Sequence, residues 1–169
     1  MGKRVYTAPV NSYGPINSPQ DVFNLLADIQ LLDREHFKAL NLNTKNQVLT
    51  VDTISIGSLN SSVVHPRDLF KIAIKRSAHS LIIAHNHPSG DLPPSKEDLE
   101  VTKRLAEAGK ILGIELCDHV IIGTQKYISF KKRGAVQEHC RVIHHQHRVA
   151  HLFQPVKIRL ELKRKPEPL

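Results

Sequence analysis

The chain has 169 residues, of which 40% are hydrophobic and 24% are charged, which favours one globular domain and excludes wholesale disorder. It contains no apolar run of the roughly 18 residues that a membrane span needs and no apolar signal core, so we expect a cytoplasmic protein without a membrane partner. The net charge is +8, but residues 1–130 hold 14 Lys and Arg against 13 Asp and Glu, whereas residues 131–169 hold 10 against 3. A nucleic-acid partner is therefore expected only through the basic C-terminal tail.

The N-terminal half begins with residues 1–17, which are rich in Pro, Gly, Ser and Asn and predict an extended lead-in. Ser18 then has the character of an N-cap and Pro19 that of a first helical residue. The apolar stripe of the predicted helix comprises Val22, Leu25, Leu26 and Ile29. Two apolar segments, residues 37–42 and 48–56, follow on either side of a short polar turn and predict a hairpin. The alternation of the second strand slips near Asp52, as in a bulged strand.

The second half predicts a helix from about Pro66 to Arg76 and then a central strand, because residues 81–84 form a short apolar run. After a loop rich in Pro and Gly, Ser95 and Asp98 have the spacing of a helix N-terminus, and Gly113 marks the end of that helix. Its apolar stripe comprises Val101, Leu105, Ala108 and Leu112. Residues 120–122 and 127–130 predict two more short strands.

The basic tail, residues 137–169, carries a second alternating pattern. Apolar side chains alternate with charged ones at Val156, Ile158, Leu160 and Leu162. This period predicts a half-exposed strand that pairs with an open sheet edge, in this molecule or in a second copy as a homo-oligomer. An unstructured tail is the alternative. The tail histidines suit adventitious metal binding, at His139, His144, His145, His147 and His151.

Three polar residues around the central strand have the spacing of a metal site. His85 and His87 emerge on the same face of a strand, about 7 Å apart at Cα. Asp98 lies in the first turn of the next helix, whose start the loop returns toward the strand end. Two histidines and one aspartate leave a fourth zinc position for water, as in catalytic sites. The alternatives are two polar residues at a loop mouth and a capping pair of Ser95 with Asp98.

The run His85-Asn86-His87-Pro88, followed by Ser95 and Asp98, resembles the signature of the JAMM (MPN-type) metalloproteases. Residues 57–62, 65–67, 105–109 and 118–123 extend the similarity to the bacterial RadC-like branch, over roughly residues 16–136. The resemblance implies an α/β fold for a domain of residues 18–136. This JAB/MPN fold has a mixed, curved β-sheet flanked by helices, with a cytidine-deaminase-like architecture.

The same resemblance implies a role for each matching position. His85, His87 and Asp98 match the ligands of one Zn²⁺ per chain, and Ser95 matches the serine that steadies the developing oxyanion. An upstream glutamate takes the proton from the water. Glu35, which lies 50 residues before His85 and just ahead of a strand, is the candidate.

Other assignments stay open around these positions. Asp33 and Asp52 compete with Glu35 for the role of base, and Glu35 has the alternative of a solvated turn carboxylate. Asp118 and His119 are interpreted as a hydrogen-bonded pair at a strand entrance, with lining of the same cleft as the alternative.

The resemblance favours a zinc-dependent hydrolase that cuts a peptide or isopeptide bond in a protein or peptide substrate. A DNA-associated module of the RadC family, linked to DNA repair and binding nucleic acid through the tail, is the first alternative. Full-length relatives carry an upstream helix-hairpin-helix domain that residues 1–17 are not expected to form, which weakens the repair association. An inactive MPN scaffold is the second alternative, and the sequence does not distinguish among possible substrates.

Overall fold

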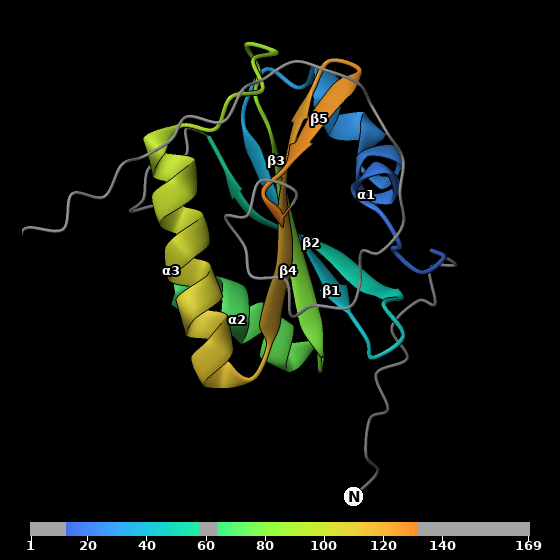
Figure 1. Ribbon diagram of the computed structural model, residues 1–169, viewed down its shortest axis with the longest axis vertical. Coiled ribbons are helices and arrows are strands. Elements are labelled where there is room, and N and C mark those ends of the chain that lie inside the picture. Colours follow the sequence, from blue (N-terminus) through green and yellow to red (C-terminus); the bar gives the residue numbers. More distant parts are fainter. Residues whose placement is uncertain (1–12, 58–63, 132–169) are drawn as a thin grey trace, which may run out of the picture.

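The structure is a computed structural model that describes residues 13–57 and 64–131 (Figure 1). Within them the chain forms one mixed five-stranded sheet in the order β2-β1-β3-β4-β5. The central strand β3 is antiparallel to β1 and parallel to β4, and the outer pairs are antiparallel. The strands are β1 (His36–Leu42), β2 (Val48–Ile56), β3 (Ser80–Asn86), β4 (Glu115–Gly123) and β5 (Lys126–Ser129).

Helices cover both faces of this sheet, so the predicted α/β class with a mixed sheet flanked by helices is confirmed (Figure 1). Helix α1 (Pro19–Leu25) and the 3₁₀ helix η1 (Ala27–Leu31) lie on one face, and α2 (Pro66–Lys75) and α3 (Lys96–Leu112) lie on the other. Ser18 and Ser95 cap α1 and α3 as predicted, and each forms a capping box, with Asp21 and with Asp98. Helix α3 ends at Gly113, whose φ of 69° is one that glycine adopts without strain.

The strand period of two divides β3 between two apolar cores. Ile82 and Ala84 pack on the side of α1, whereas Leu81 and Ile83 pack on the side of α2 and α3. The core on the α2 and α3 side also contains Phe37, Ala39, Leu69, Phe70, Ala73, Val101, Leu105 and Leu116. By the same alternation, His85 and the following His87 project toward α3.

Two local predictions differ from the structure. The first helix ends at Leu25 rather than running through Ile29, and a 3₁₀ turn follows. Because a 3₁₀ helix has three residues per turn, the side chains of Leu26 and Ile29 lie on the same side, and both are buried in one core. Strand β4 begins at Glu115 instead of residue 120, because β3 offers it a parallel partner along its whole length. A register shift between Leu116 and Asp118 hides that pairing from the apolar period.

The bulged hairpin is confirmed. The strand pairing is irregular at two positions, one on each side of Asp52, rather than at Asp52 itself. The pairing of β1 with β2 skips Ile54 and Leu49. Residues 13–17 of the lead-in join the fold through a bridge from Pro15 to Gln47 and through buried Ile16.

Several sequence-based expectations lie outside the described residues. These are the first 12 residues of the lead-in, the strand of residues 156–163, the histidines of the tail and every partner assigned to residues 137–169. The helices of the described part are too short or too polar to cross a bilayer.

Candidate metal centre

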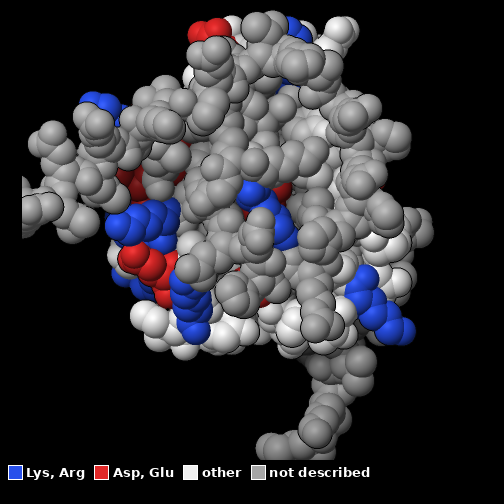
Figure 2. All heavy atoms as spheres, in the orientation of Figure 1, with Lys and Arg blue, Asp and Glu red and all other residues white. Residues whose placement is uncertain are grey.

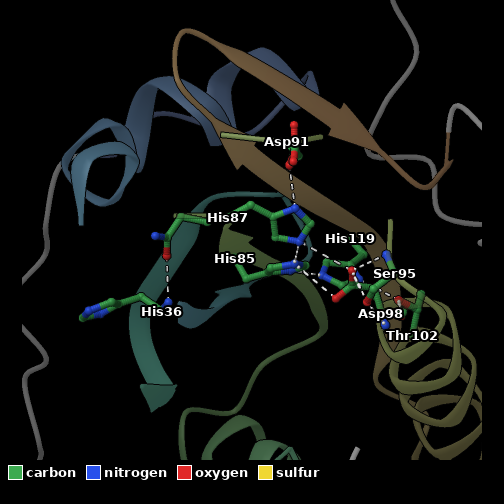
Figure 3. Close-up of polar contacts among 9 residues, drawn as sticks. His36, His85, His87, Asp91, Ser95, Asp98, Thr102 and His119 are labelled. Carbon is green, nitrogen blue, oxygen red and sulfur yellow. Dashed lines mark hydrogen bonds and ion pairs between the residues drawn. The ribbon is translucent and has the colours of Figure 1, made fainter. Parts of the chain in front are cut away.

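Two histidines leave the end of the central strand on one face. His85 is the penultimate residue of β3 and is fully buried, and His87 follows the strand with 12% of its side chain exposed. The backbone N–H of His87 donates to the carbonyl of Ile122, 3.1 Å away, which continues the alignment with β4. The strand geometry therefore aims both imidazoles toward the start of α3, as Figure 3 shows.

Asp98 brings a carboxylate to the same point from the first turn of α3. Its Oδ2 accepts hydrogen bonds from the Ser95 N–H and the Ser95 hydroxyl, each at 2.7 Å. Its Oδ1 lies 3.2 Å from His85 Nε2, and Oδ2 lies 3.5 Å from His87 Nε2. The capping role and the role in the cluster were alternatives at the level of sequence, and one carboxylate fills both positions.

The three side chains form a compact set of donor atoms. One ligand atom from each of His85, His87 and Asp98 lies within 4.8 Å of the others. The two Nε2 atoms are only 2.9 Å apart, and Asp98 is 1% exposed. The three residues are thus positioned to bind a metal ion.

A hydrogen bond fixes which nitrogen of His87 faces this set. Its Nδ1 lies 2.6 Å from the carbonyl oxygen of Asp91 (Figure 3). A carbonyl oxygen only accepts, so Nδ1 carries the hydrogen and donates it. In the neutral ring, Nε2 therefore presents a lone pair to Asp98 and His85.

A longer chain of hydrogen bonds does the same for His85. The Thr102 hydroxyl donates to the Asp98 carbonyl at 2.6 Å, so its oxygen accepts from His119 Nδ1, also 2.6 Å away. His119 Nε2 is then the acceptor for His85 Nδ1, at 2.8 Å. His85 Nε2 is left with its lone pair, turned toward His87.

The pKa shifts describe the metal-free cluster, in which a proton takes the place of a metal ion. Burial lowers the pKa of His119 well below its usual value, which keeps the ring neutral as the chain requires. Burial alone would raise the pKa of Asp98, but hydrogen bonds from His85 and His87, which form when a proton is bound at Nε2, and from Ser95 outweigh it and hold that pKa far below the usual range. The hydrogen bond to Asp98 raises the pKa of His87, so without a metal this cluster favours a proton as its cation.

Aromatic rings close the buried side of the cluster. Phe37 stacks on His85 with ring centroids 6.1 Å apart, and Phe130 stacks on His119 at 4.5 Å. Both phenylalanines are at most 1% exposed. This apolar wall lowers the local polarity, which strengthens the attraction between the donor atoms and a cation.

Glu35 is the residue immediately before β1, at the end of the sheet where the cluster lies. The antiparallel register that pairs Phe37 with His85 would, two residues further, place Glu35 beside His87. Glu35 shares a face with Phe37 by strand alternation, and its charge contributes to the raised pKa of His87. Neither competitor shares this place, because Asp33 is exposed in the preceding turn and Asp52 is bonded to Arg76 at 2.8 Å.

Ser95 lies beside the cluster with its hydroxyl hydrogen on Asp98. Its Oγ also accepts from the Asp98 N–H at 3.0 Å, which completes the cap of α3. The oxyanion role assigned to Ser95 at the level of sequence stays a prediction.

Sequence reasoning missed Thr102 and gave His119 the wrong place. Asp118 Oδ1 does accept from the His119 backbone N–H at 2.8 Å, but the two residues lie within β4 and not at its entrance. The His119 ring belongs to the cluster, which was the alternative. An isolated histidine in an apolar strand and a threonine one helical turn after Asp98 were the available signals.

Residues 16–135 match the family model of the RadC-like JAB domain. Among curated relatives, the chain is 58% identical over 137 residues to a UPF0758 protein of Desulforamulus reducens, covering 80% of this chain and 60% of that protein. It is 55% identical over 135 residues to one of Caldanaerobacter subterraneus subsp. tengcongensis, covering 79% and 58%. A relative from Desulfitobacterium hafniense is 58% identical over 135 residues, covering 79% and 60%.

The chain thus spans about 60% of the length of the curated relatives it matches. The matched residues contain the whole sheet and each side chain of the cluster, so family and geometry agree on the same part of the chain. This protein belongs to the RadC-like JAB domain family.

Proposed function

We propose that the protein is a zinc-dependent hydrolase of the JAMM type, which cleaves a peptide or isopeptide bond in a protein or peptide substrate. The convergence of His85 Nε2, His87 Nε2 and the Asp98 carboxylate within 4.8 Å carries the proposal. Two imidazoles and one carboxylate suit zinc, and three protein ligands leave a fourth position open, as catalytic sites require. Lone pairs that face one another at 2.9 Å favour a cation between them.

The residues around the cluster have separable roles in this proposal. A zinc ion held there supplies Lewis acidity and makes water a nucleophile near neutral pH. The Glu35 carboxylate accepts a proton from the attacking water and passes it to the leaving amine. Ser95 turns its hydroxyl from Asp98 to the substrate carbonyl oxygen, while its backbone N–H keeps Asp98 in place.

Metal analysis of chelator-free protein tests the proposal. We expect about one zinc per chain in the wild type, because the site has a single set of three ligands. Asp98→Ala should lose the metal, whereas Glu35→Gln should keep it and lose hydrolysis of a peptide and isopeptide library. Full activity of Glu35→Gln would reject the role of Glu35 alone. Metal-free wild type would reject the hydrolase and favour the inactive scaffold.

Nucleic-acid binding is a second candidate, and the charge of residues 131–169 is the observation that favours it. Figure 2 shows acidic and basic side chains next to one another over α3, so the described surface there has mixed sign. Binding through the tail should weaken steeply with salt and disappear when residues 137–169 are removed. Binding that persists without the tail would contradict this candidate.

A further inference from the structure

Asn86 lies between the two histidines, and its side chain points the other way. It is fully buried, and its amide makes three hydrogen bonds with the segment that precedes β1. Oδ1 accepts from the His36 backbone N–H at 2.7 Å, and Nδ2 donates to the carbonyl of Arg34 at 2.9 Å. A longer bond of 3.4 Å joins Nδ2 to the Leu32 carbonyl.

These contacts hold the backbone on both sides of Glu35. The Arg34 carbonyl belongs to the peptide bond before Glu35 and the His36 N–H to the one after it. On the opposite edge, the Glu35 carbonyl accepts from the Gly57 N–H at 2.9 Å. Glu35 is thus fixed between β2 and the side chain of a β3 residue, at the point where the β1–β3 ladder ends.

Only a short amide side chain matches these partners. The segment presents one N–H and two carbonyl oxygens, so its partner must be one acceptor and a donor with two hydrogens. A carboxylate would set oxygen against the carbonyls, and an apolar side chain would leave buried polar groups without partners. We call the three hydrogen bonds of the Asn86 amide with this segment the backbone clamp. In the sequence His-Asn-His, the residue that makes this clamp lies between two metal-ligand candidates.

The side chains of Asn86 and of the two histidines point to opposite sides of the strand. Successive residues of the strand alternate, so His85 and His87 face α3 while the Asn86 amide reaches the Glu35 backbone. The His36 ring is turned away from the histidine cluster in Figure 3. Side chains of successive residues in an extended segment alternate, so we expect the Glu35 side chain on the cluster side.

We infer that Asn86 is a positioning residue, whose amide holds the Glu35 carboxylate on the face of the sheet where His85, His87 and Asp98 converge. The inference rests on the proposed function in one respect, the role of Glu35 beside the metal. The clamp on the backbone is testable without any metal.

The first experiment measures hydrogen exchange in metal-free protein. Asn86→Leu keeps the volume and Asn86→Ser keeps some polarity, so a folding failure of one still leaves the other. Asn41→Leu is the matched control, because Asn41 is also fully buried in the sheet but bonds to Thr50 and Asp52. We expect at least tenfold faster exchange of the His36 amide in the Asn86 variants and no change there in Asn41→Leu. Unchanged His36 exchange in a folded Asn86 variant would overturn the clamp.

The second experiment uses cobalt as a spectroscopic substitute for zinc. In the wild type, the visible absorption should change with pH as the bound water loses a proton. Glu35→Gln should shift the pH midpoint of this change by about one pH unit. Each folded Asn86 variant should shift the midpoint in the same direction, and Asn86→Leu should add nothing in a Glu35→Gln background. Asn41→Leu should keep the wild-type midpoint.

The outcomes separate the two ideas. Additive shifts, or a wild-type midpoint in a folded Asn86 variant, would overturn the positioning of Glu35 while leaving the metal centre intact. Failure of the wild type to bind cobalt or zinc would overturn the proposed function and with it the role of Glu35, and the exchange experiment would still decide on the clamp.

Discussion

Two carboxylates on the same face of the sheet are both largely buried and both have a lowered pKa, yet their partners differ. Asp52 binds the Arg76 guanidinium at 2.8 Å and accepts from Asn41 and Thr50 at 2.9 and 2.6 Å. Asp98 instead faces two imidazoles, whose Nδ1 hydrogens are already committed to other acceptors.

The difference lies in where the positive charge comes from. Arg76 is charged at every physiological pH, so the cluster around Asp52 contains its own cation. Burial opposes ionisation of Asp52, but the bonds from Arg76, Thr50 and Asn41 prevail and lower its pKa. Among the described residues around Asp98, the positive charge is supplied by a proton on an imidazole or by a bound metal ion. An acid beside imidazole lone pairs is thus positioned to bind a metal ion, whereas an acid beside a guanidinium already has its cation.

The largest expected effect is on stability. Zinc at a thousandfold excess over its Kd should stabilise the fold by about 4 kcal/mol, because it binds the native state alone. For a chain of this size, that corresponds to a rise in Tm of about 10 °C, measured by calorimetry. A chelator should reverse the rise. A Tm that does not change when zinc is added would show that the cluster around Asp98 needs no external cation.

A matched pair of substitutions separates the two carboxylates. Asp98→Asn should weaken zinc binding by more than about 100-fold, since loss of a group behind a ligand already costs roughly 10 to 100-fold. Asp52→Asn should leave zinc affinity unchanged and lower the free energy of unfolding by about 1 kcal/mol, a small value because Arg76 is partly exposed and screened. Competition with a chromophoric chelator and urea unfolding measure the two quantities. Equal effects of both substitutions on zinc would contradict the distinction.

The pH dependence should have opposite signs with and without metal. The raised pKa of His87 stabilises metal-free protein fully below the unfolded value of 6.5, and this stabilisation is lost as pH rises through the folded pKa. Zinc competes with the same proton, so stabilisation by zinc grows over that window. The melting temperatures with and without zinc, measured between about pH 6 and 8, should therefore converge toward low pH. The Asp52–Arg76 pair stays intact over this range. Parallel curves would contradict the role of His87.

A smaller effect is expected one step behind the ligands. Thr102→Val keeps the shape of the side chain and removes the hydroxyl that orients His119 and, through it, His85. Zinc affinity should fall by about tenfold. Thr50→Val, which removes a hydroxyl bonded to Asp52, is the control and should leave zinc affinity unchanged. If both valine variants bind zinc like the wild type, the hydrogen-bond chain does not support the site.

The sequence was sufficient for the parts of the fold that depend on local chemistry. The N-caps at Ser18 and Ser95, the bulged hairpin and the apolar central strand are encoded by neighbours in the chain, and they are confirmed. The 3₁₀ turn after Leu25 and the early start of β4 depend on what each segment packs against, which periodicity does not report.

The candidate site divides in the same way. The spacing of His85, His87 and Asp98 is carried by one strand, one loop and one helix, so it was visible in the sequence. The contacts of His119 with His85, and of Asn86 with the segment around Glu35, join residues 34 and 50 or more positions apart. Such contacts depend on strand register, which short sequence motifs do not specify.

Anomalous diffraction at the zinc edge, from crystals grown with equimolar zinc, tests the central claim most directly. The account predicts one strong peak between His85 Nε2, His87 Nε2 and a carboxylate oxygen of Asp98, and no peak near Asp52. A peak elsewhere with imidazole rings that diverge from Asp98, or no peak in protein that is otherwise intact, would contradict it.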